Sequence, residues 1–256
     1  MTAKRRRILG SSLVGAVMLA ISCGGGPQQA PAAPAAPVVN PVDPATAGSV
    51  TGIISFTGTA PARDVIKMAA DPRCMPEGGS ASTEAVLVDT TGGLQNVFVY
   101  VKDGLGNLVF PVPATPVVLD QKGCVYRPHV FGVQVGQPVE ILNSDATLHN
   151  IHAMPATNQE FNAGQALQGL RHTHVFSARE VMVPFKCDVH RWMNAYVGVL
   201  DHPFHSVSTA DGAFSLAGLP PGTYTIEAVH EKLGAQSQTV TIGEKETKEL
   251  AFTFKS

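Results

Sequence analysis

From residue 48 onward, the chain consists of short β-branched and aromatic runs separated by Gly, Pro and Asp. Such runs predict strands, and no apolar pattern of helical period extends over ten residues after position 23. The composition agrees, because only 15% of the residues are charged while the chain holds 25 Gly and 19 Pro. The predicted strands are 50–56, 97–101, 117–119, 130–135, 139–142, 181–185, 196–200, 214–216, 224–229, 239–242 and 250–254. We therefore expect an all-β protein built of sandwiches.

The first 22 residues have the pattern of a signal peptide. Lys4-Arg5-Arg6-Arg7 precedes an apolar stretch, 8–21, that is too short to span a bilayer comfortably. Leu19-Ala20-Ile21-Ser22-Cys23 resembles the lipobox of bacterial lipoproteins, which implies lipidation of Cys23. The alternative is plain cleavage near Ser22 with Cys23 left as a free thiol. We expect an exported lipoprotein, held to a membrane by its N-terminal lipid and facing the periplasm or the cell exterior.

Residues 23–47 are rich in Pro, Ala and Gly and contain no aromatic side chain, so they are expected to form a tether rather than a packed structure. Removal of residues 1–22 leaves 14 basic and 20 acidic side chains, a net charge of −6. This balance argues against nucleic acid as a partner, because phosphate binding needs an excess of Lys and Arg.

The residues with metal-binding chemistry are concentrated in one short segment, 187–193. Cys187, His190 and Met193 follow one another at intervals of three, between the predicted strands 181–185 and 196–200. A thiolate, an imidazole and a thioether are the donor set of blue-copper sites, which also need a second His. His149, soon after strand 139–142, is available for that position. Zinc more often recruits two or more Cys, or His with a carboxylate, and has no use for Met.

These motifs occur in the order typical of a known family. Residues 117–201 resemble a plastocyanin-type cupredoxin, a blue-copper protein, with the short ligand loop seen in amicyanin. The matching features are Tyr126-Arg127-Pro128, Val135-Gly136-Gln137, the segment 139–145, His149-Asn150 and the C-x-x-H-x-x-M loop. The resemblance implies one type 1 copper ion bound by His149, Cys187, His190 and axial Met193. It also implies that Asn150 joins the two ligand segments by hydrogen bonds.

Several residues in this region have more than one interpretation. His152 competes with His149 as the first histidine ligand, whereas His172 and His174 are expected to be surface or loop histidines. Trp192 forms either an exposed apolar rim or a lid packed over the site. Met193 is either the axial ligand or a core methionine beside a strand.

A second resemblance covers the C-terminal residues. Segments 209–216 and 218–226, with Asp211-Gly212 and Pro220-Pro221-Gly222 as turns, resemble the carboxypeptidase regulatory-like (prealbumin-like) β-sandwich. Residues 203–256 are too few for an independent core, so we expect them to form one split sandwich with 48–108. The cupredoxin-like Greek-key sandwich, 109–202, is then inserted in it. The alternative is two modules joined in tandem. Insertion predicts that strands near 50–56 and 97–101 pair or pack with 224–229 and 250–254.

Cys74 and Cys124 remain once Cys23 is assigned to lipid and Cys187 to copper. In an oxidising compartment we expect them to form a disulfide, the alternative being two free, buried thiols.

The chain contains no Ser/His/Asp, zinc-protease or phosphate-loop motif, so we expect no enzyme. The expected function is electron transfer to or from a redox partner protein. The alternatives are a non-redox copper-binding or copper-delivery protein that also uses His152, and an adhesive or scaffold sandwich with a vestigial metal site. Loading with zinc in the cell is left open.

Overall fold

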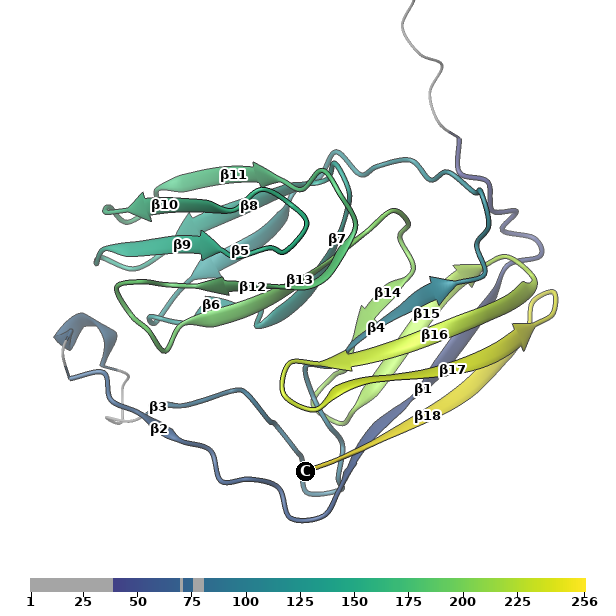
Figure 1. Ribbon diagram of the computed structural model, residues 1–256, viewed down its shortest axis with the longest axis horizontal. Helices are drawn as coiled ribbons and strands as arrows, with labels where there is room; N and C mark the ends of the chain where they lie inside the picture. Colours follow the sequence, from purple (N-terminus) through teal and green to yellow (C-terminus); the bar gives the residue numbers. More distant parts are fainter. Residues whose placement is uncertain (1–38, 70, 76–80) are drawn as a thin grey trace, which may run out of the picture. The chain divides into compact units, whose positions relative to one another are not determined.

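The computed structural model describes residues 39–69, 71–75 and 81–256 (Figure 1). The predicted signal peptide, Cys23 and most of the tether lie outside these residues. In the described part of the chain the only helix is η1 (Pro72–Cys74), a single 3-10 turn, and all other regular elements are strands. The chain is therefore all-β, as the sequence predicts. No helix among these residues has the length and apolarity needed to cross a membrane.

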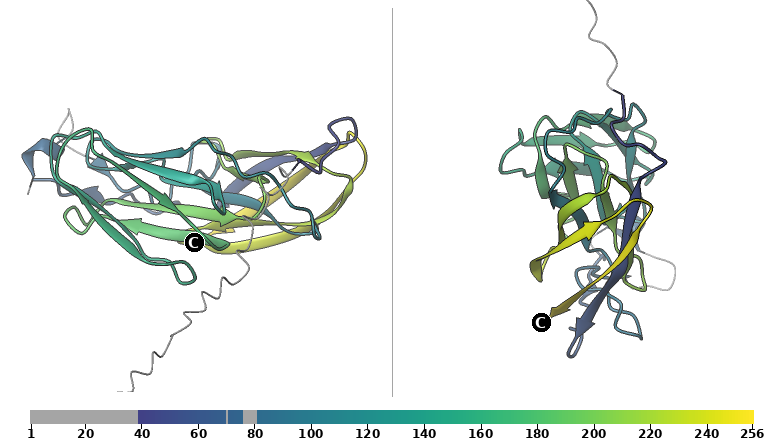
Figure 2. Two further views of the ribbon diagram at one scale, coloured as in Figure 1. Left: turned by 90° about the horizontal axis from the view of Figure 1, so that it is seen from above. Right: turned by 90° about the vertical axis from the view of Figure 1, so that its right-hand side faces the viewer.

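Strands from both ends of the described chain form one sandwich, which we call the terminal sandwich. Its two sheets have the strand orders β15-β1-β18 and β14-β4-β16-β17. The strands are β1 (Gly48–Thr57), β4 (Phe98–Asp103), β14 (His205–Val207), β15 (Ala213–Leu219), β16 (Gly222–His230), β17 (Gly234–Ile242) and β18 (Thr247–Lys255). β1 runs parallel to β18 from Ser49↔Thr247 to Thr57↔Lys255 (Figure 2), and β4 pairs with β16. The expected pairing between the two ends of the chain is thus observed.

The intervening residues form a second, central sandwich with strand orders β10-β9-β12-β13-β7 and β11-β8-β5-β6. Its strands are β5 (Val117–Gln121), β6 (Tyr126–Arg127), β7 (Val130–Gln134), β8 (Pro138–Asn143), β9 (His149–Ala153), β10 (Phe161–Gln165), β11 (Arg171–Val175), β12 (Glu180–Lys186) and β13 (Asn194–Leu200). Alternate side chains of these strands, among them Ile141, Ile151 and Val197, fill one buried core.

Four strands of the central sandwich, β6, β9, β10 and β11, are absent from the sequence prediction. β9 begins at His149, in a region expected to be a loop. Its sequence, HNIHA, carries polar side chains at three of five positions, which hides the alternation of a half-buried strand. His172 and His174, expected on the surface or in a loop, lie on strand β11 and are half-buried.

A small apolar cluster joins the two sandwiches. Phe98 and Tyr100 of β4 pack with Val130 of β7 and Leu200 of β13. Gly198 permits this approach, because a Cβ at that position would overlap the ring of Phe98.

The connection between β1 and β4 is long and reaches the central sandwich. It contains the short strands β2 (Val65–Ile66) and β3 (Ala81–Ser82) and the helical turn η1. Cys74, at the end of η1, forms a disulfide with Cys124, and their Cα atoms are 5.3 Å apart. The predicted disulfide is confirmed.

Candidate metal centre

The tight turn between β12 and β13 presents three of the predicted ligands. Cys187 follows the last residue of β12, and Met193 precedes the first residue of β13. The N–H of Cys187 donates to the carbonyl of Met193 (3.2 Å). The N–H of Met193 donates to the carbonyl of His190 (2.9 Å). Cys187, His190 and Met193 are all buried. The turn is therefore fixed by backbone hydrogen bonds and by packing.

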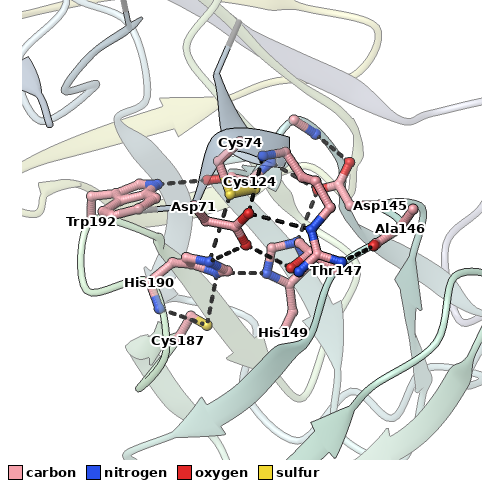
Figure 3. Close-up of a disulfide and its surroundings, with 12 residues drawn as sticks. Asp71, Cys74, Cys124, Asp145, Ala146, Thr147, His149, Cys187, His190 and Trp192 are labelled. Carbon is pink, nitrogen blue, oxygen red and sulfur yellow. Dashed lines mark hydrogen bonds and ion pairs between the residues drawn. A yellow bond between two sulfur atoms is a disulfide. The ribbon is translucent and has the colours of Figure 1, made fainter. Parts of the chain in front are cut away.

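His149, at the start of β9, is brought to the same place and is fully buried. Its Nδ1 lies 2.9 Å from Nδ1 of His190, and Sγ of Cys187 lies 4.0 Å from the same His190 atom (Figure 3). Metal–nitrogen bonds of about 2.0 Å and metal–sulfur bonds of about 2.3 Å separate neighbouring ligand atoms by about 3.3–3.7 Å. The observed separations lie on both sides of this range, so the three side chains fit one metal ion with small adjustments.

The Cys187 sulfur is surrounded by hydrogen-bond donors. The backbone N–H groups of His190 (3.3 Å) and Asn150 (3.5 Å) point to Sγ. Burial raises the pKa of the Cys187 thiol, but hydrogen bonds from His149 and from backbone N–H groups outweigh it and leave the pKa below its ordinary value. This environment favours the thiolate, the form that binds metals.

The two imidazoles carry different charges. Burial lowers the pKa of His149, but Asp145 and Cys187 more than compensate and raise it to about 9. Burial and the charge of His149 lower the pKa of His190. Nε2 of His149 lies 2.9 Å from Oδ2 of Asp145, which also accepts the N–H of Cys124 (2.8 Å). Nε2 of His149 thus donates to Asp145, while its Nδ1 faces both the sulfur of Cys187 and Nδ1 of His190.

Asn150 connects the two ligand segments. Its Oδ1 accepts the N–H of Asp188 (2.5 Å), the residue after Cys187. Its Nδ2 donates to Oδ1 of Asn162 (2.6 Å) on β10, and its carbonyl accepts the Tyr126 hydroxyl (2.5 Å). These contacts have the form that the sequence resemblance implies for Asn150.

Three other histidines of the central sandwich, His152, His172 and His174, have partners outside this cluster. His152 contacts two carboxylates, with Nε2 2.6 Å from Glu160 and Nδ1 2.9 Å from Asp188. The rings of His172 and His174 stack on Phe161. The structure therefore brings His149, and not His152, together with Cys187 and His190.

Trp192 lies against the site. Its ring centroid is 5.1 Å from that of His190, and its indole N–H donates to the carbonyl of Cys124 (2.9 Å). Of the two interpretations left open by the sequence, the half-buried indole fits packing over the site.

Besides Asp145, sequence reasoning missed two residues near the site, Asp71 and Thr147. Oδ2 of Asp71 lies 3.3 Å from Nε2 of His190 and accepts the Thr147 hydroxyl (2.6 Å). This hydrogen bond is the main reason that the pKa of Asp71 falls to about 2. Asp71 is 119 residues from His190 in sequence. The one sequence feature that could have indicated Asp71 is the predicted Cys74–Cys124 disulfide, because it brings the residues around Cys74 close to the site.

Neither a family model nor a curated protein matches the chain. Among solved structures, the copper-containing nitrite reductase of Thermus scotoductus SA-01 is 19% identical over 40% of this chain and 26% of its own, with a TM-score of 0.32. A mutant of amicyanin in the Cu(I) state is 21% identical over 34% of this chain and 85% of its own (TM-score 0.30). A purple cupredoxin from Nitrosopumilus maritimus is 24% identical over 33% and 98% (TM-score 0.29).

The chain thus spans about a quarter of the nitrite reductase. At these TM-scores the similarities carry no argument about function, so the evidence for a metal comes from the residues of the chain itself.

Proposed function

We propose that this protein binds one copper ion through His149, Cys187 and His190, with Met193 as a weak axial donor, and transfers single electrons. The observation that supports this most strongly is the convergence of one nitrogen from each imidazole and one buried sulfur within 4.8 Å of one another, with the two Nδ1 atoms 2.9 Å apart. A thiolate with two imidazoles and a thioether is the donor set of a type 1 copper site. Copper, when bound, supplies the one-electron couple.

The surroundings of the donors favour a centre that keeps its shape when its charge changes. The hydrogen bonds within the turn 187–193 and those of Asn150 limit movement of both ligand segments. The ligand side chains are at most 4% exposed, so the protein excludes most water from their neighbourhood. Ligands that hardly move between the Cu(I) and Cu(II) states give the site a low reorganisation energy, which favours electron transfer.

The same burial distinguishes this proposal from copper delivery. A protein that hands over its metal needs donors that a partner can reach, whereas the sulfur of Cys187 is enclosed and hydrogen-bonded. The convergence of three donors, His149, Cys187 and His190, also argues against a vestigial site on an adhesive or scaffold sandwich.

Location and partner are part of the proposal. We infer that the protein is exported, attached to a membrane through lipid on Cys23, and exchanges electrons with a partner protein rather than acting as an enzyme. The Cys74–Cys124 disulfide supports export, because such bonds persist in oxidising compartments. The terminal sandwich, in this proposal a carboxypeptidase regulatory-like module, acts as a scaffold.

Voltammetry of the copper-loaded protein tests electron transfer against delivery. We expect a reversible one-electron wave from one copper per chain, with Cu(I) retained during challenge by a Cu(I) chelator. A Cu(I) form that releases its ion to the chelator within the mixing time, and gives no reversible wave, would contradict electron transfer and support delivery. His152→Ala is the matched control, because it removes a neighbouring histidine that touches none of the proposed ligands.

A further inference from the structure

Residues 71–74, which belong to the connection between β1 and β4, cover ligand His190. Three separate contacts hold them against the central sandwich (Figure 3). Cys74 is joined to Cys124, the hydroxyl of Thr147 donates to Oδ2 of Asp71 (2.6 Å), and the guanidinium of Arg73 donates to the carbonyl of Ala146 (2.9 Å). A segment fixed in this way can contribute a side chain to the site.

The two carboxylate oxygens of Asp71 have different hydrogen-bond partners. Oδ1 accepts the N–H of Arg73 (3.0 Å), which caps the turn η1, and Pro72 occupies its first position. Oδ2 is left to face Thr147 and Nε2 of His190, the latter at 3.3 Å. Capping therefore fixes the orientation of the carboxylate that reaches the imidazole.

The chemistry of a carboxylate decides which nitrogen of His190 carries the proton. An ionised carboxylate only accepts hydrogen bonds, so Nε2 must donate. In a neutral imidazole the other nitrogen, Nδ1, then has its lone pair free. That lone pair faces Nδ1 of His149 and Sγ of Cys187, where a metal would bind.

We propose that Asp71 is a positioning residue for His190, which holds the ring in the Nε2–H tautomer and strengthens Nδ1 as a metal donor. Carboxylates that accept from a ligating histidine have both effects in metal sites. Here the carboxylate comes from the β1–β4 connection, so a segment outside the strands of the central sandwich completes the centre. The part of this inference that concerns the metal rests on the proposed function; the tautomer does not.

Asp71→Asn is the decisive variant. Asn caps a helical turn as well as Asp, so η1 keeps its cap, but the amide nitrogen can now face His190 and donate to it. Nitrogen-15 NMR of the metal-free protein reports the tautomer directly. We expect Nε2–H in the wild type and a shift towards Nδ1–H in Asp71→Asn. An unchanged His190 tautomer would overturn the proposal.

Copper binding gives the second readout. With copper present, Asp71→Asn is expected to weaken Cu(II) binding about 10- to 100-fold and to raise the reduction potential, since a weaker imidazole donor favours Cu(I). If the wild type and Asp71→Asn have equal Cu(II) affinity and equal reduction potential, the claim that Asp71 strengthens His190 as a metal donor is overturned. If neither protein binds copper, the proposed function fails, while the tautomer still decides the role of Asp71.

Two more variants separate positioning from folding. Asp89→Asn alters a half-buried carboxylate of the same connection that accepts the N–H groups of Thr91 and Gly93. This variant should leave the tautomer of His190 and the copper affinity unchanged. Thr147→Val removes the second partner of Oδ2 without touching His190, and should give a smaller shift in the same direction. If Asp71→Asn fails to fold, an unchanged tautomer and unchanged copper affinity in Thr147→Val would overturn the proposal.

Discussion

Both sandwiches bury histidines, but the hydrogen-bond partners and the pKa values of these histidines differ. In the terminal sandwich, His202 donates from Nε2 to the carbonyl of Val101 (2.9 Å) and accepts the N–H of Phe204 at Nδ1 (3.2 Å). Burial, as the main cause, lowers the pKa of His202, and likewise of His230, to about 4. At the candidate metal centre, Asp145 and Cys187 keep His149 charged despite burial, with a pKa of about 9.

The difference shows that burial alone does not identify a functional histidine. The backbone occupies both nitrogens of His202, so no lone pair is left for a ligand. At the metal centre, carboxylates occupy Nε2 of each ring and leave both Nδ1 atoms facing a sulfur, where a bound metal would displace the Nδ1 proton of His149. The partners of a buried imidazole, rather than its exposure, separate a structural role from a metal-binding one.

Among the variants, the largest expected loss of stability comes from removing the disulfide, which belongs to the metal centre and has no counterpart among the described residues of the terminal sandwich. Replacing Cys74 and Cys124 with Ala should reduce the free energy of unfolding by about 2–4 kcal/mol, because the unfolded chain regains the entropy of a 50-residue loop. Urea unfolding followed by Trp192 fluorescence measures the loss. Hydrogen exchange should show the loss of protection in strands β6 and β9. A loss confined to β1 and β18 would contradict this assignment.

Acid should destabilise the terminal sandwich through His202 and His230. Their folded pKa lies below the unfolded value of about 6.5, so the unfolded state binds protons first as the pH falls. Stability is fully present above pH 6.5 and should decline towards pH 4, by up to about 3 kcal/mol for each histidine. Unfolding free energies measured from pH 7 to 4 test this, and His202→Gln should flatten part of the slope. A wild-type slope near zero in this window would contradict it.

Disturbing the apolar contact between the two sandwiches should give the next largest loss of stability. Gly198→Ala places a Cβ against the ring of Phe98, and the forced repacking should cost about 1–3 kcal/mol. Thermal unfolding measures this cost. Gly164→Ala is the matched control in the same sandwich, because nothing lies within 4 Å of its added Cβ. Equal stability of the two variants would show that the close approach at Gly198 is dispensable.

The smallest effect is expected at His152, which has two carboxylate partners but no sulfur. His152→Ala should leave the copper absorption spectrum unchanged and cost no more than about 1 kcal/mol, because both carboxylate partners are exposed to solvent. Loss of the copper signal in His152→Ala, with retention in His149→Ala, would reverse the assignment of the first histidine ligand.

The sequence predicts most strands and the disulfide because each depends on local pattern or on cysteine number. Strands rich in Val, Ile and Phe, such as β1 and β13, are found close to their predicted positions. β9 was missed because the residues that build the site, His149 and Asn150, replace the apolar side chains that mark a strand.

The missed parts of the candidate site are the residues supplied by tertiary contact. Cys187, His190 and Met193 are close in sequence, so their spacing reveals their chemistry. Asp71 approaches His190 from a distant connection, and an aspartate before a proline in a turn has an ordinary local role. Its relation to the ligand appears only once the chain is folded.

The most direct test of the central claim is the absorption and spin-resonance spectrum of the purified protein with Cu(II), recorded beside Cys187→Ser. The proposal predicts one copper per chain and an intense visible charge-transfer band in the wild type, because the thiolate supplies that transition. Cys187→Ser should lack the band and keep the circular dichroism of a folded β-protein. An intense band that survives in Cys187→Ser, or a wild-type protein that binds Cu(II) without such a band, would contradict the proposed type 1 centre.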